Sequence, residues 1–325
     1  MLTALQFVQG AVARKDFVPV LTHFSIKDGF IKGYNGRLGL CSPIPLELNV
    51  HPKAASFIKA VQTCRETATL HITKSGKLAV RSGNFKAYIE CLDDAFPDVE
   101  PEGTYIELTE PLLNVIRKLA PFISEDASRP WSRGILFRGN AAFVTNNVIF
   151  IEHWLGYNFS TELNIPYAAV RELLRIGLEP IAMQVSPSSV TFHYPDKQWL
   201  KASVYDEPWP DISSLFDKTK DPSDYPEELF AALHDLEPFA DEIGRVYFEE
   251  NRVATSNDDE IGAVVEVPGI AAQCVFQLKY LLMLEGLADK IDFTNYPQPC
   301  QFQGTQLRGI PGDAESDTAL GQGCA

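Results

Sequence analysis

The chain has 325 residues and a formal net charge of −15, with 45% hydrophobic and 11% aromatic residues. This length exceeds what one hydrophobic core usually supports, so two or three domains are expected. No run approaches the roughly 18 apolar residues that span a bilayer, and the first residues lack the pattern of a secretory signal, so a cytoplasmic protein is expected. The acidic average argues against a protein that coats nucleic acid, although an average can hide a local cationic patch.

Cysteine and histidine spacing predicts neither disulfides nor a metal site. The six cysteines contain no CxxC pair and, in a chain of this length, are typical of reduced thiols. The six histidines form no HxxxH pair, and none lies near a cysteine at the spacing of metal ligands. No metal and no cofactor is therefore expected.

Amphipathic segments and strand hairpins alternate along the chain. A first segment of helical period leads into the alternating stretch LTHFSIKDGFIKGY, and the next leads to the hairpin GKLAVRSGNFKAYIECLDD. The same order returns with RGILFRGNAAFVT and SSVTFHYPDKQWLKASV, and again with IGRVYFEENRVATS. Two helices per repeat are expected, over residues 5–12, 54–61, 112–119, 170–174, 229–236 and 278–282.

Three copies of one unit fill the chain. The corner FPD after the first hairpin returns as WPD after the second, and LLNVIRKLAPF at 112–122 returns as LFAALHDLEPF at 229–239. Alternating strands with helices on one side bury one face of antiparallel sheets. The sequence therefore predicts an α+β fold of three similar domains with two helices each. Proline- and acid-rich joints place these repeats at 1–103, 104–217 and 218–325.

These residues resemble the bacterial beta sliding clamps, the processivity rings of replicative DNA polymerases. The resemblance is carried by KDFVPVL, GKLAVRSGNFKAYIECLDDAFPD, SRGILFRGNAAFVTNN, IPYAAVRELLRI and ASVYDEPWPDI, in this order, over residues 1–312. It implies the DNA clamp fold, in which each chain forms a half-ring and a homodimer closes head to tail around duplex DNA. The resemblance further implies that helices line the hole and sheets form the outer wall. It also implies that a DNA polymerase and a clamp loader bind through short peptide motifs, and that the chain is not an enzyme.

Basic residues gather on or beside the predicted helices of this acidic chain. A helix that packs one face on a sheet turns its other face away, and phosphate contacts by Lys and Arg are independent of base sequence. The predicted nonspecific DNA contacts, of which Lys15 matches a basic position of the family, are Arg14, Lys15, Lys53, Lys59, Arg117, Lys118, Arg171 and Arg175. The alternative, solvated helix faces without a partner, stays open.

The resemblance also implies a partner-binding cleft between the second and third domains. The family's groove accepts short linear peptides with apolar anchors, so its lining has to be apolar. The matching positions are Phe150, Pro210, Leu215 and Ile310. Isolated apolar residues are more often simply core, and this alternative applies to all four.

The chain departs from the family at several places. The stretch NNVI at 146–149 replaces an Asp-Gly-His-Arg turn beside the cleft, and no strand is expected before the first helix or between DPSDYP and the helix that follows. The segment 227–242 has six acidic residues and no Lys or Arg, so it would repel phosphate if it faced DNA. The tail GDAESDTALGQGCA is expected to be disordered.

Two other function classes compete with this interpretation. A clamp-like protein that does not encircle DNA, but sequesters a polymerase or clamp loader, is favoured by the acidic third repeat and opposed by the basic faces of the first two. An enzyme would need catalytic groups, but adjacent carboxylates such as Asp93 with Asp94, or Asp258 with Asp259, usually point apart. The glycine-rich GYNGRLG at 33–39 lies in a strand region and not in a strand-to-helix phosphate loop, so no nucleotide role is expected.

Overall fold

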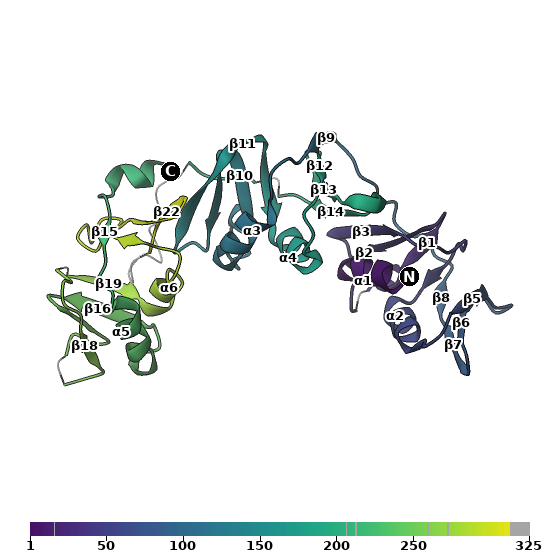
Figure 1. Cartoon of the computed structure of the whole chain (residues 1–325), viewed down its shortest axis with the longest axis horizontal. Coiled ribbons are helices and arrows are strands. Elements are labelled where there is room, and N and C mark those ends of the chain that lie inside the picture. The colour runs from purple at the N-terminus through teal and green to yellow at the C-terminus, as the bar shows by residue number, and fades with distance from the viewer. Residues whose placement is uncertain (16, 206, 212, 259, 272, 313–325) are drawn as a thin grey trace. The chain divides into compact units, whose positions relative to one another are not determined.

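The computed structural model describes residues 1–15, 17–205, 207–211, 213–258, 260–271 and 273–312 (Figure 1). The chain forms two compact units: unit 1 comprises residues 1–117 and 165–206, and unit 2 comprises residues 118–164 and 207–325. Each unit combines helices with antiparallel sheets, which confirms the predicted α+β class. Within the described residues, no helix is both long enough and apolar enough to cross a bilayer.

Six α-helices occur in the described part of the chain, one for each segment of helical period. They are α1 (Leu2–Val8), α2 (Ala54–Thr63), α3 (Leu113–Leu119), α4 (Tyr167–Ile176), α5 (Leu229–Leu236) and α6 (Leu278–Leu282). Each buries its apolar stripe, as α2 does with Phe57 and Val61. The first helix ends earlier than the pattern predicts, because a 3₁₀ turn (Gln9–Ala11) follows it and Val12 is already extended.

A seven-stranded antiparallel sheet is the main sheet of unit 1. Its order is β1 (Ser25–Lys27), β2 (Phe30–Tyr34), β3 (Leu38–Pro43), β14 (Trp199–Ser203), β13 (Ser189–His193), β12 (Ala182–Val185) and β9 (Thr104–Glu107). Helix α1 packs on β2 and β3, and α4 packs on β14. At the β3–β14 joint, Cys41 lies opposite Trp199 and Leu40 opposite Leu200. Strands of two sequence repeats are thus hydrogen-bonded into one sheet.

Two smaller sheets complete unit 1. One is a meander of β5 (Thr69–Ile72), β6 (Leu78–Ser82) and β7 (Phe85–Ile89), and the other pairs β4 (His51–Pro52) with β8 (Cys91–Leu92). The β6–β7 turn contains Gly83 at a φ of 52°, and the β13–β14 turn contains Asp196 at a φ of 60°. The two long hairpins predicted from GKLAVRSGNFKAYIECLDD and SSVTFHYPDKQWLKASV are therefore formed, each through residues of positive φ. The stretch RGILFRGNAAFVT, also predicted as a hairpin, lies in the single strand β10 (Gly134–Thr145).

Unit 2 contains a six-stranded sheet and a four-stranded sheet. The first has the order β10 (Gly134–Thr145), β11 (Phe150–Pro166), β22 (Leu307–Ile310), β21 (Phe302–Gly304), β20 (Lys290–Ile291) and β15 (Ser223–Asp224). The second has the order β18 (Val264–Glu266), β17 (Arg252–Ala254), β16 (Arg245–Glu249) and β19 (Cys274–Gln277), and α5 packs on β17 and β18. The short strand β15 corrects the expectation that no strand precedes α5.

The joint between β11 and β22 is closely packed. Phe150 lies opposite Ile310, and Glu152 lies opposite Arg308. At Gly309, a Cβ atom would lie 2.3 Å from the carbonyl oxygen of Phe150, so only glycine allows β22 to approach β11 this closely.

The two compact units do not coincide with the three predicted domains. In unit 1, β3 of the first repeat pairs with β14 of the second, and in unit 2, β11 of the second repeat pairs with β22 of the third. Each of these two sheets contains strands from two predicted domains. Backbone hydrogen bonds therefore join the predicted domains to each other. The division into three domains stays a prediction from the sequence repeats, and the tail after residue 312 lies outside the described residues.

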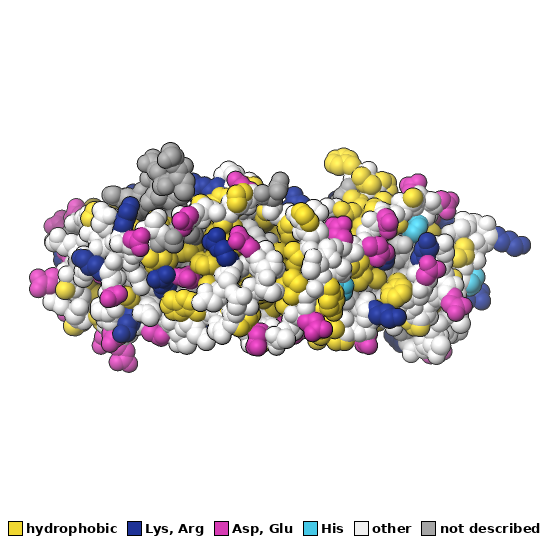
Figure 2. Space-filling view, turned by 90° about the horizontal axis from the view of Figure 1, so that it is seen from above, with side chains coloured by type: hydrophobic (Ala, Val, Ile, Leu, Met, Phe, Trp, Pro, Cys, Tyr) yellow, Lys and Arg dark blue, Asp and Glu magenta, His cyan; other side chains and the backbone are white. Residues whose placement is uncertain are grey.

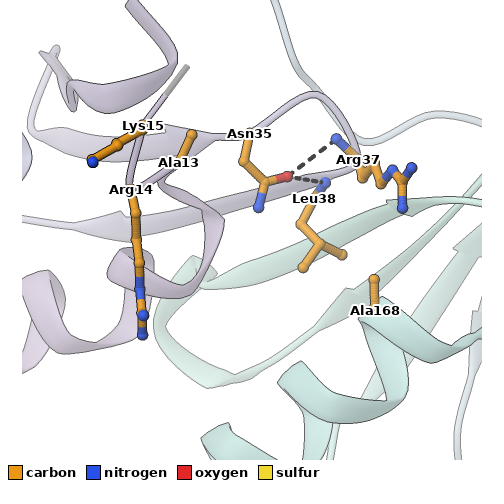
Figure 3. A pocket seen from close by; sticks show the side chains of 7 residues that line it. All are labelled: Ala13, Arg14, Lys15, Asn35, Arg37, Leu38 and Ala168. Carbon is orange, nitrogen blue, oxygen red and sulfur yellow. Dashed lines mark hydrogen bonds between the residues drawn. The ribbon is translucent and has the colours of Figure 1, made fainter.

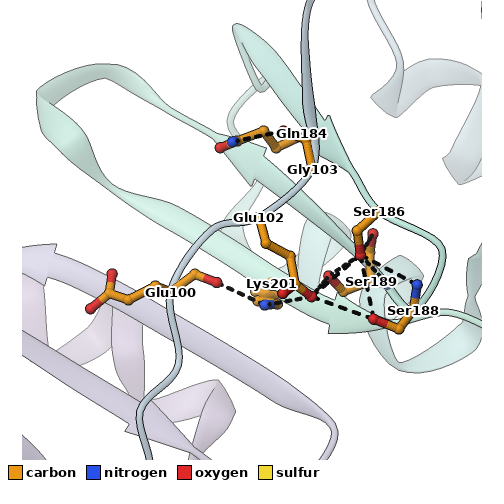
Figure 4. A network of polar contacts seen from close by, with 8 residues as sticks. All are labelled: Glu100, Glu102, Gly103, Gln184, Ser186, Ser188, Ser189 and Lys201. Atoms are coloured by element: carbon orange, nitrogen blue, oxygen red, sulfur yellow. Dashed lines mark hydrogen bonds and ion pairs between the residues drawn. The ribbon is translucent and has the colours of Figure 1, made fainter.

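A polar network around Glu102 fastens the segment before β9 to the turn between β12 and β13 (Figure 4). Glu102 Oε1 accepts hydrogen bonds from the hydroxyls of Ser189 at 2.7 Å and Ser186 at 3.3 Å, and lies 3.1 Å from Lys201 Nζ. Lys201 Nζ also donates to the carbonyl oxygen of Glu100 at 2.7 Å. These contacts, led by the Ser189 hydrogen bond, lower the pKa of Glu102 to about 2.

We expect the Glu102 network to weaken in acid. Because the pKa of Glu102 is lower in the folded protein, its contribution to stability is complete above the ordinary value of 4.5 and is lost as the pH falls towards 2. Glu102→Gln should therefore show a smaller drop in melting temperature between about pH 6 and about pH 3 than the unmodified protein. Glu107→Gln, at an exposed position on β9, is the control, and equal drops in Glu102→Gln and unmodified protein would contradict the prediction.

Candidate functional site

An aromatic cluster in unit 2 is the first candidate site. It consists of the buried Leu136, Phe150 and Trp209, and the partly buried Trp131, Phe143 and Phe216. β10 and β11 supply three of these side chains, and loops and 3₁₀ turns supply the others. Large aromatic rings that reach the surface together are typical of binding surfaces, because they offer much apolar area at a small cost in conformational entropy.

Ring contacts hold the aromatic cluster together. Phe150 stacks on Phe143, with ring centroids 6.2 Å apart and planes within 8°, and Phe216 lies tilted against Phe150 at 5.7 Å. Trp131 meets Trp209 edge to face at 5.1 Å. The buried Nε1 of Trp209 has no hydrogen-bond partner among the described residues. Such an unpartnered donor is uncommon in a purely structural core.

The strand register brings together two of the four predicted cleft residues. Phe150 on β11 lies directly opposite Ile310 on β22, and both are buried. Pro210 directly follows a tryptophan of the cluster, and Leu215 lies in the 3₁₀ helix η6 (Ser213–Lys218), which also carries a phenylalanine of the cluster. Pro210 and Leu215 are half-buried. All four positions are thus within the aromatic cluster or next to it, and their role in binding stays a prediction.

Asparagines build the turn at 146–149 between β10 and β11. The Oδ1 atom of Asn146 accepts the backbone N–H groups of Val148 at 3.0 Å and Ile149 at 2.7 Å. Asn147 has a φ of 72°, and its Nδ2 donates to the Ser124 hydroxyl at 2.7 Å. These local bonds fix the turn without the histidine and arginine that the family carries there. The geometry of this turn therefore depends on local hydrogen bonds and on Ser124.

A cationic pocket in unit 1 is the second candidate site (Figure 3). Its volume is about 610 Å³, and it is lined by Ala13, Arg14, Lys15, Asn35, Arg37, Leu38 and Ala168. Figure 3 shows that its cations come from two segments, the chain after α1 and the β2–β3 turn. Asn35 Oδ1 fixes that turn by accepting the backbone N–H groups of Arg37 at 3.1 Å and Leu38 at 2.9 Å.

The three cations that line this pocket are exposed. None of Arg14, Lys15 and Arg37 forms an ion pair with a described residue, and no carboxylate is found among the described residues that line the pocket. Like charges gathered in this way attract a polyanion such as a nucleic-acid backbone. Sequence reasoning missed Arg37, because a single arginine in a glycine-rich turn gives no sign that the turn will fold back onto residues 14 and 15.

The remaining predicted DNA contacts lie on helices, and all but Arg175 present exposed cations with no ion pair to a described residue. They are Lys53 at the start of α2, Lys59 on α2, Arg117 and Lys118 at the end of α3, and Arg171 on α4. Arg171 lies over the Tyr167 ring at 5.7 Å, and Arg117 donates to Asn114. Their contact with DNA stays a prediction.

Arg175 is engaged within unit 1. Its Nε donates to Glu172 at 2.8 Å, its Nη1 to the carbonyl of Gln6 at 2.8 Å, and its Nη2 to the carbonyl of Phe7 at 2.6 Å. The guanidinium thus ties α4 to the carboxyl end of α1, where helix carbonyls lack partners. We leave Arg175 out of the proposed contact surface for this reason.

The outward face of α5 and its flanks is acidic, as the sequence predicts. Leu229 and Leu233 point into unit 2, whereas all six acidic residues of the segment are exposed: Glu227, Glu228, Asp235, Glu237, Asp241 and Glu242. This face offers no favourable contact to phosphate. Figure 2 shows the molecule turned by 90° from Figure 1. On the face seen there, acidic and basic side chains are interspersed with hydrophobic ones, and the charge is mixed.

The fold is that of the bacterial beta sliding clamps. The Caulobacter crescentus beta sliding clamp matches with a TM-score of 0.81 over 96% of both chains, at 18% sequence identity. The beta subunit from DNA polymerase of Streptococcus pyogenes matches with a TM-score of 0.77 at 15% identity, and the Helicobacter pylori beta clamp, bound to DNA ligase peptide, with 0.77 at 16%, both over the same 96% shares. By sequence alone, no protein-family model and no curated protein matches. The structural likeness confirms the clamp fold that the sequence resemblance implied.

Proposed function

We propose that this chain is a DNA sliding clamp, a homodimeric processivity factor that encircles duplex DNA nonspecifically and tethers a DNA polymerase or related replication factor. The single observation that carries the proposal is the clamp fold, which extends over 96% of the chain. The function needs no catalytic group, because tethering converts a bimolecular encounter into a local one at high effective concentration.

Two unpaired strand edges support closure into a ring. Two strand pairs within the chain follow the same rule, in which an early strand of one repeat pairs with the last strand of the next repeat. These pairs are β3 with β14 and β11 with β22. The third such pair is not formed within the described chain: β7, the last long strand of the first repeat, and β18, an early strand of the third, are edges of their sheets. In our proposal a second copy supplies both partners, so that two β7–β18 pairings close the ring.

Side chains on these edges suit such a pairing. Tyr88 on β7 and Val264 on β18 keep 53% and 58% of their surface exposed. Lys86 on β7 and Glu266 on β18 are exposed charges of opposite sign. In the second and third repeats, the strand that precedes the first helix pairs with the strand farthest from the joint: β9 with β12, and β15 with β20. By the same rule, a strand before α1 would pair with β5, at the edge of its sheet opposite β7. Pairing at the β7 edge therefore does not depend on such a strand.

The two candidate sites supply the contacts that tethering needs. The cationic pocket and the exposed cations of α2, α3 and α4 would hold phosphates without reading bases. The aromatic cluster would bind a short peptide of the polymerase or loader through apolar anchors. A DNA ligase peptide bound to the Helicobacter pylori clamp is a precedent for such a partner.

Retention on circular DNA tests the proposal. Light scattering is expected to give twice the 36.1 kDa of one chain. After incubation with circular DNA, protein should co-elute with the circle at about 0.5 M salt, where phosphate contacts are screened, and should be released by linearisation. Val264→Asp, with a charge on the β18 edge, should be monomeric and should not be retained, because a charge facing the partner strand opposes pairing. Ile243→Asp, exposed but outside the strand edges, should behave as the unmodified protein.

One observation favours a second function. The acidic outward face of α5 suits a clamp-like protein that does not encircle DNA and instead sequesters a polymerase or clamp loader. A monomeric unmodified protein, or equal loss from circular and linear DNA, would support this alternative and contradict the ring.

A further inference from the structure

We propose that the aromatic cluster selects an acidic linear peptide, and that Arg308 binds the peptide's carboxylate. This inference rests on the proposed peptide-docking function and adds the chemistry of the partner. It starts from a local contrast: the chain carries a net charge of −15, yet two arginines, Arg138 and Arg308, lie over aromatic rings of this cluster.

Arg308 is held in place beside the cluster by three contacts. Its Nε donates to Glu152 Oε2 at 2.6 Å, across the β11–β22 pair. Its Cζ lies 4.0 Å from the ring centroid of Phe216 and 5.9 Å from that of Trp154. A stacked guanidinium has already lost most of its side-chain entropy, so a ligand that binds it has less ordering to impose.

The outer part of this guanidinium is available to a ligand. The side chain of Arg308 is 35% exposed, and its Nη1 and Nη2 atoms bond to no described residue. An arginine has five N–H donors, of which Glu152 engages one. Two parallel N–H groups fit the two oxygens of a carboxylate, which gives both strength and direction.

Further arginines extend the cationic rim of the cluster. Arg138 lies over the ring of Phe143, with Cζ 5.4 Å from the centroid, and it is exposed. Arg129 and Arg133 flank Trp131 in the chain. A peptide with negative charge is attracted to this rim, whereas the acidic remainder of the chain repels it, so charge helps to choose both the partner and its place of docking.

The period of a strand sets the spacing between anchor and carboxylate. Ile310 and Arg308 are two residues apart on β22 and therefore project from the same face of the sheet, about 6.6 Å apart along the strand. An extended peptide has the same period. With its aromatic anchor on the partly buried rings of the cluster, beside Ile310, it would present an Asp or Glu to Arg308 two residues away.

Fluorescence anisotropy with synthetic nonapeptides tests the inference. One peptide contains a phenylalanine and an aspartate two residues away, its counterpart carries asparagine at the aspartate position, and both orders of the pair are measured. We expect the aspartate peptide to bind about tenfold tighter in one order, because a charge-assisted bidentate bond replaces a neutral one. The ratio should fall as salt is raised.

Arg308→Gln is expected to bring the aspartate-to-asparagine ratio close to one while the asparagine peptide keeps its affinity. Arg308→Lys, which keeps the charge without the planar fork, should give an intermediate ratio. Arg252→Gln is the matched control, because Arg252 is 37% exposed and paired with Glu249 but lies in the other sheet of unit 2. Unchanged tryptophan fluorescence in each variant verifies folding.

Three outcomes separate this inference from the function on which it rests. An unchanged ratio in Arg308→Gln overturns the role of Arg308. Equal binding of both peptides, each weakened by Phe216→Ala, leaves the docking site in place and overturns the acidic preference. Binding of neither peptide to the unmodified protein overturns both.

Discussion

Replacing Arg14, Lys15 and Arg37 together by alanine is expected to weaken binding of duplex DNA about tenfold or more at about 0.1 M salt. The three side chains line one pocket, and its described lining includes no carboxylate. Each phosphate contact that is lost also removes a released counterion. The slope of log affinity against log salt should therefore become shallower by roughly 2.7, at about 0.9 per contact.

The control for this variant removes the same charge elsewhere in unit 1. Lys27, Lys74 and Lys197 are exposed lysines outside the cationic pocket. Their joint replacement by alanine should leave the salt slope nearly unchanged. Anisotropy titrations of a labelled duplex at several salt concentrations measure both slopes. Equal slopes for the two triple variants would show that the pocket is not a phosphate site.

Phe150→Ala is expected to lower the free energy of unfolding of unit 2 by about 3–5 kcal/mol, the usual cost of deleting a buried phenylalanine ring. The side chain is almost fully buried and contacts Phe143 and Phe216. Loss of the ring leaves a cavity at the β11–β22 joint, where Gly309 already allows very close packing. Urea unfolding followed by tryptophan fluorescence reports this change, since three of the four tryptophans lie in unit 2.

Two further variants give the Phe150 result its meaning. Phe150→Leu keeps most of the volume and should cost less than about 1.5 kcal/mol, while it removes the ring that stacks in the aromatic cluster. Phe239→Ala deletes an exposed ring of unit 2 and should change stability by less than about 0.5 kcal/mol. If Phe150→Ala unfolded at the same urea concentration as Phe239→Ala, the cluster would not be part of the core of unit 2.

Local elements of this protein are predictable from sequence because their signals are local. The helical period of residues 54–61 and 229–236 is enough to place α2 and α5, since it reflects which side chains share one face. The turns of both long hairpins are likewise indicated by Gly and Asp residues that tolerate positive φ. The short strand β15 is missed, because two residues carry no period.

The candidate sites are only partly predictable. Phe150 and Ile310 come from the family resemblance, and their pairing across β11 and β22 is known only from the register. Charge counting cannot separate Arg175, whose donors hold α1 to α4, from Arg37, whose side chain is open. Whether a cation is free depends on neighbours that are distant in the chain.

The sequence by itself determined the three repeats, the six helices, the α+β class and an acidic chain with local basic faces, since each follows from periodicity and composition along a short stretch. The tertiary structure alone decided which strands join: β3 with β14 and β11 with β22, while β7 and β18 stay edges. The physical reason is that any alternating strand can pair with many others. The choice among them is made by side-chain packing and backbone approach at the joint, as at Gly309, and not by a local pattern.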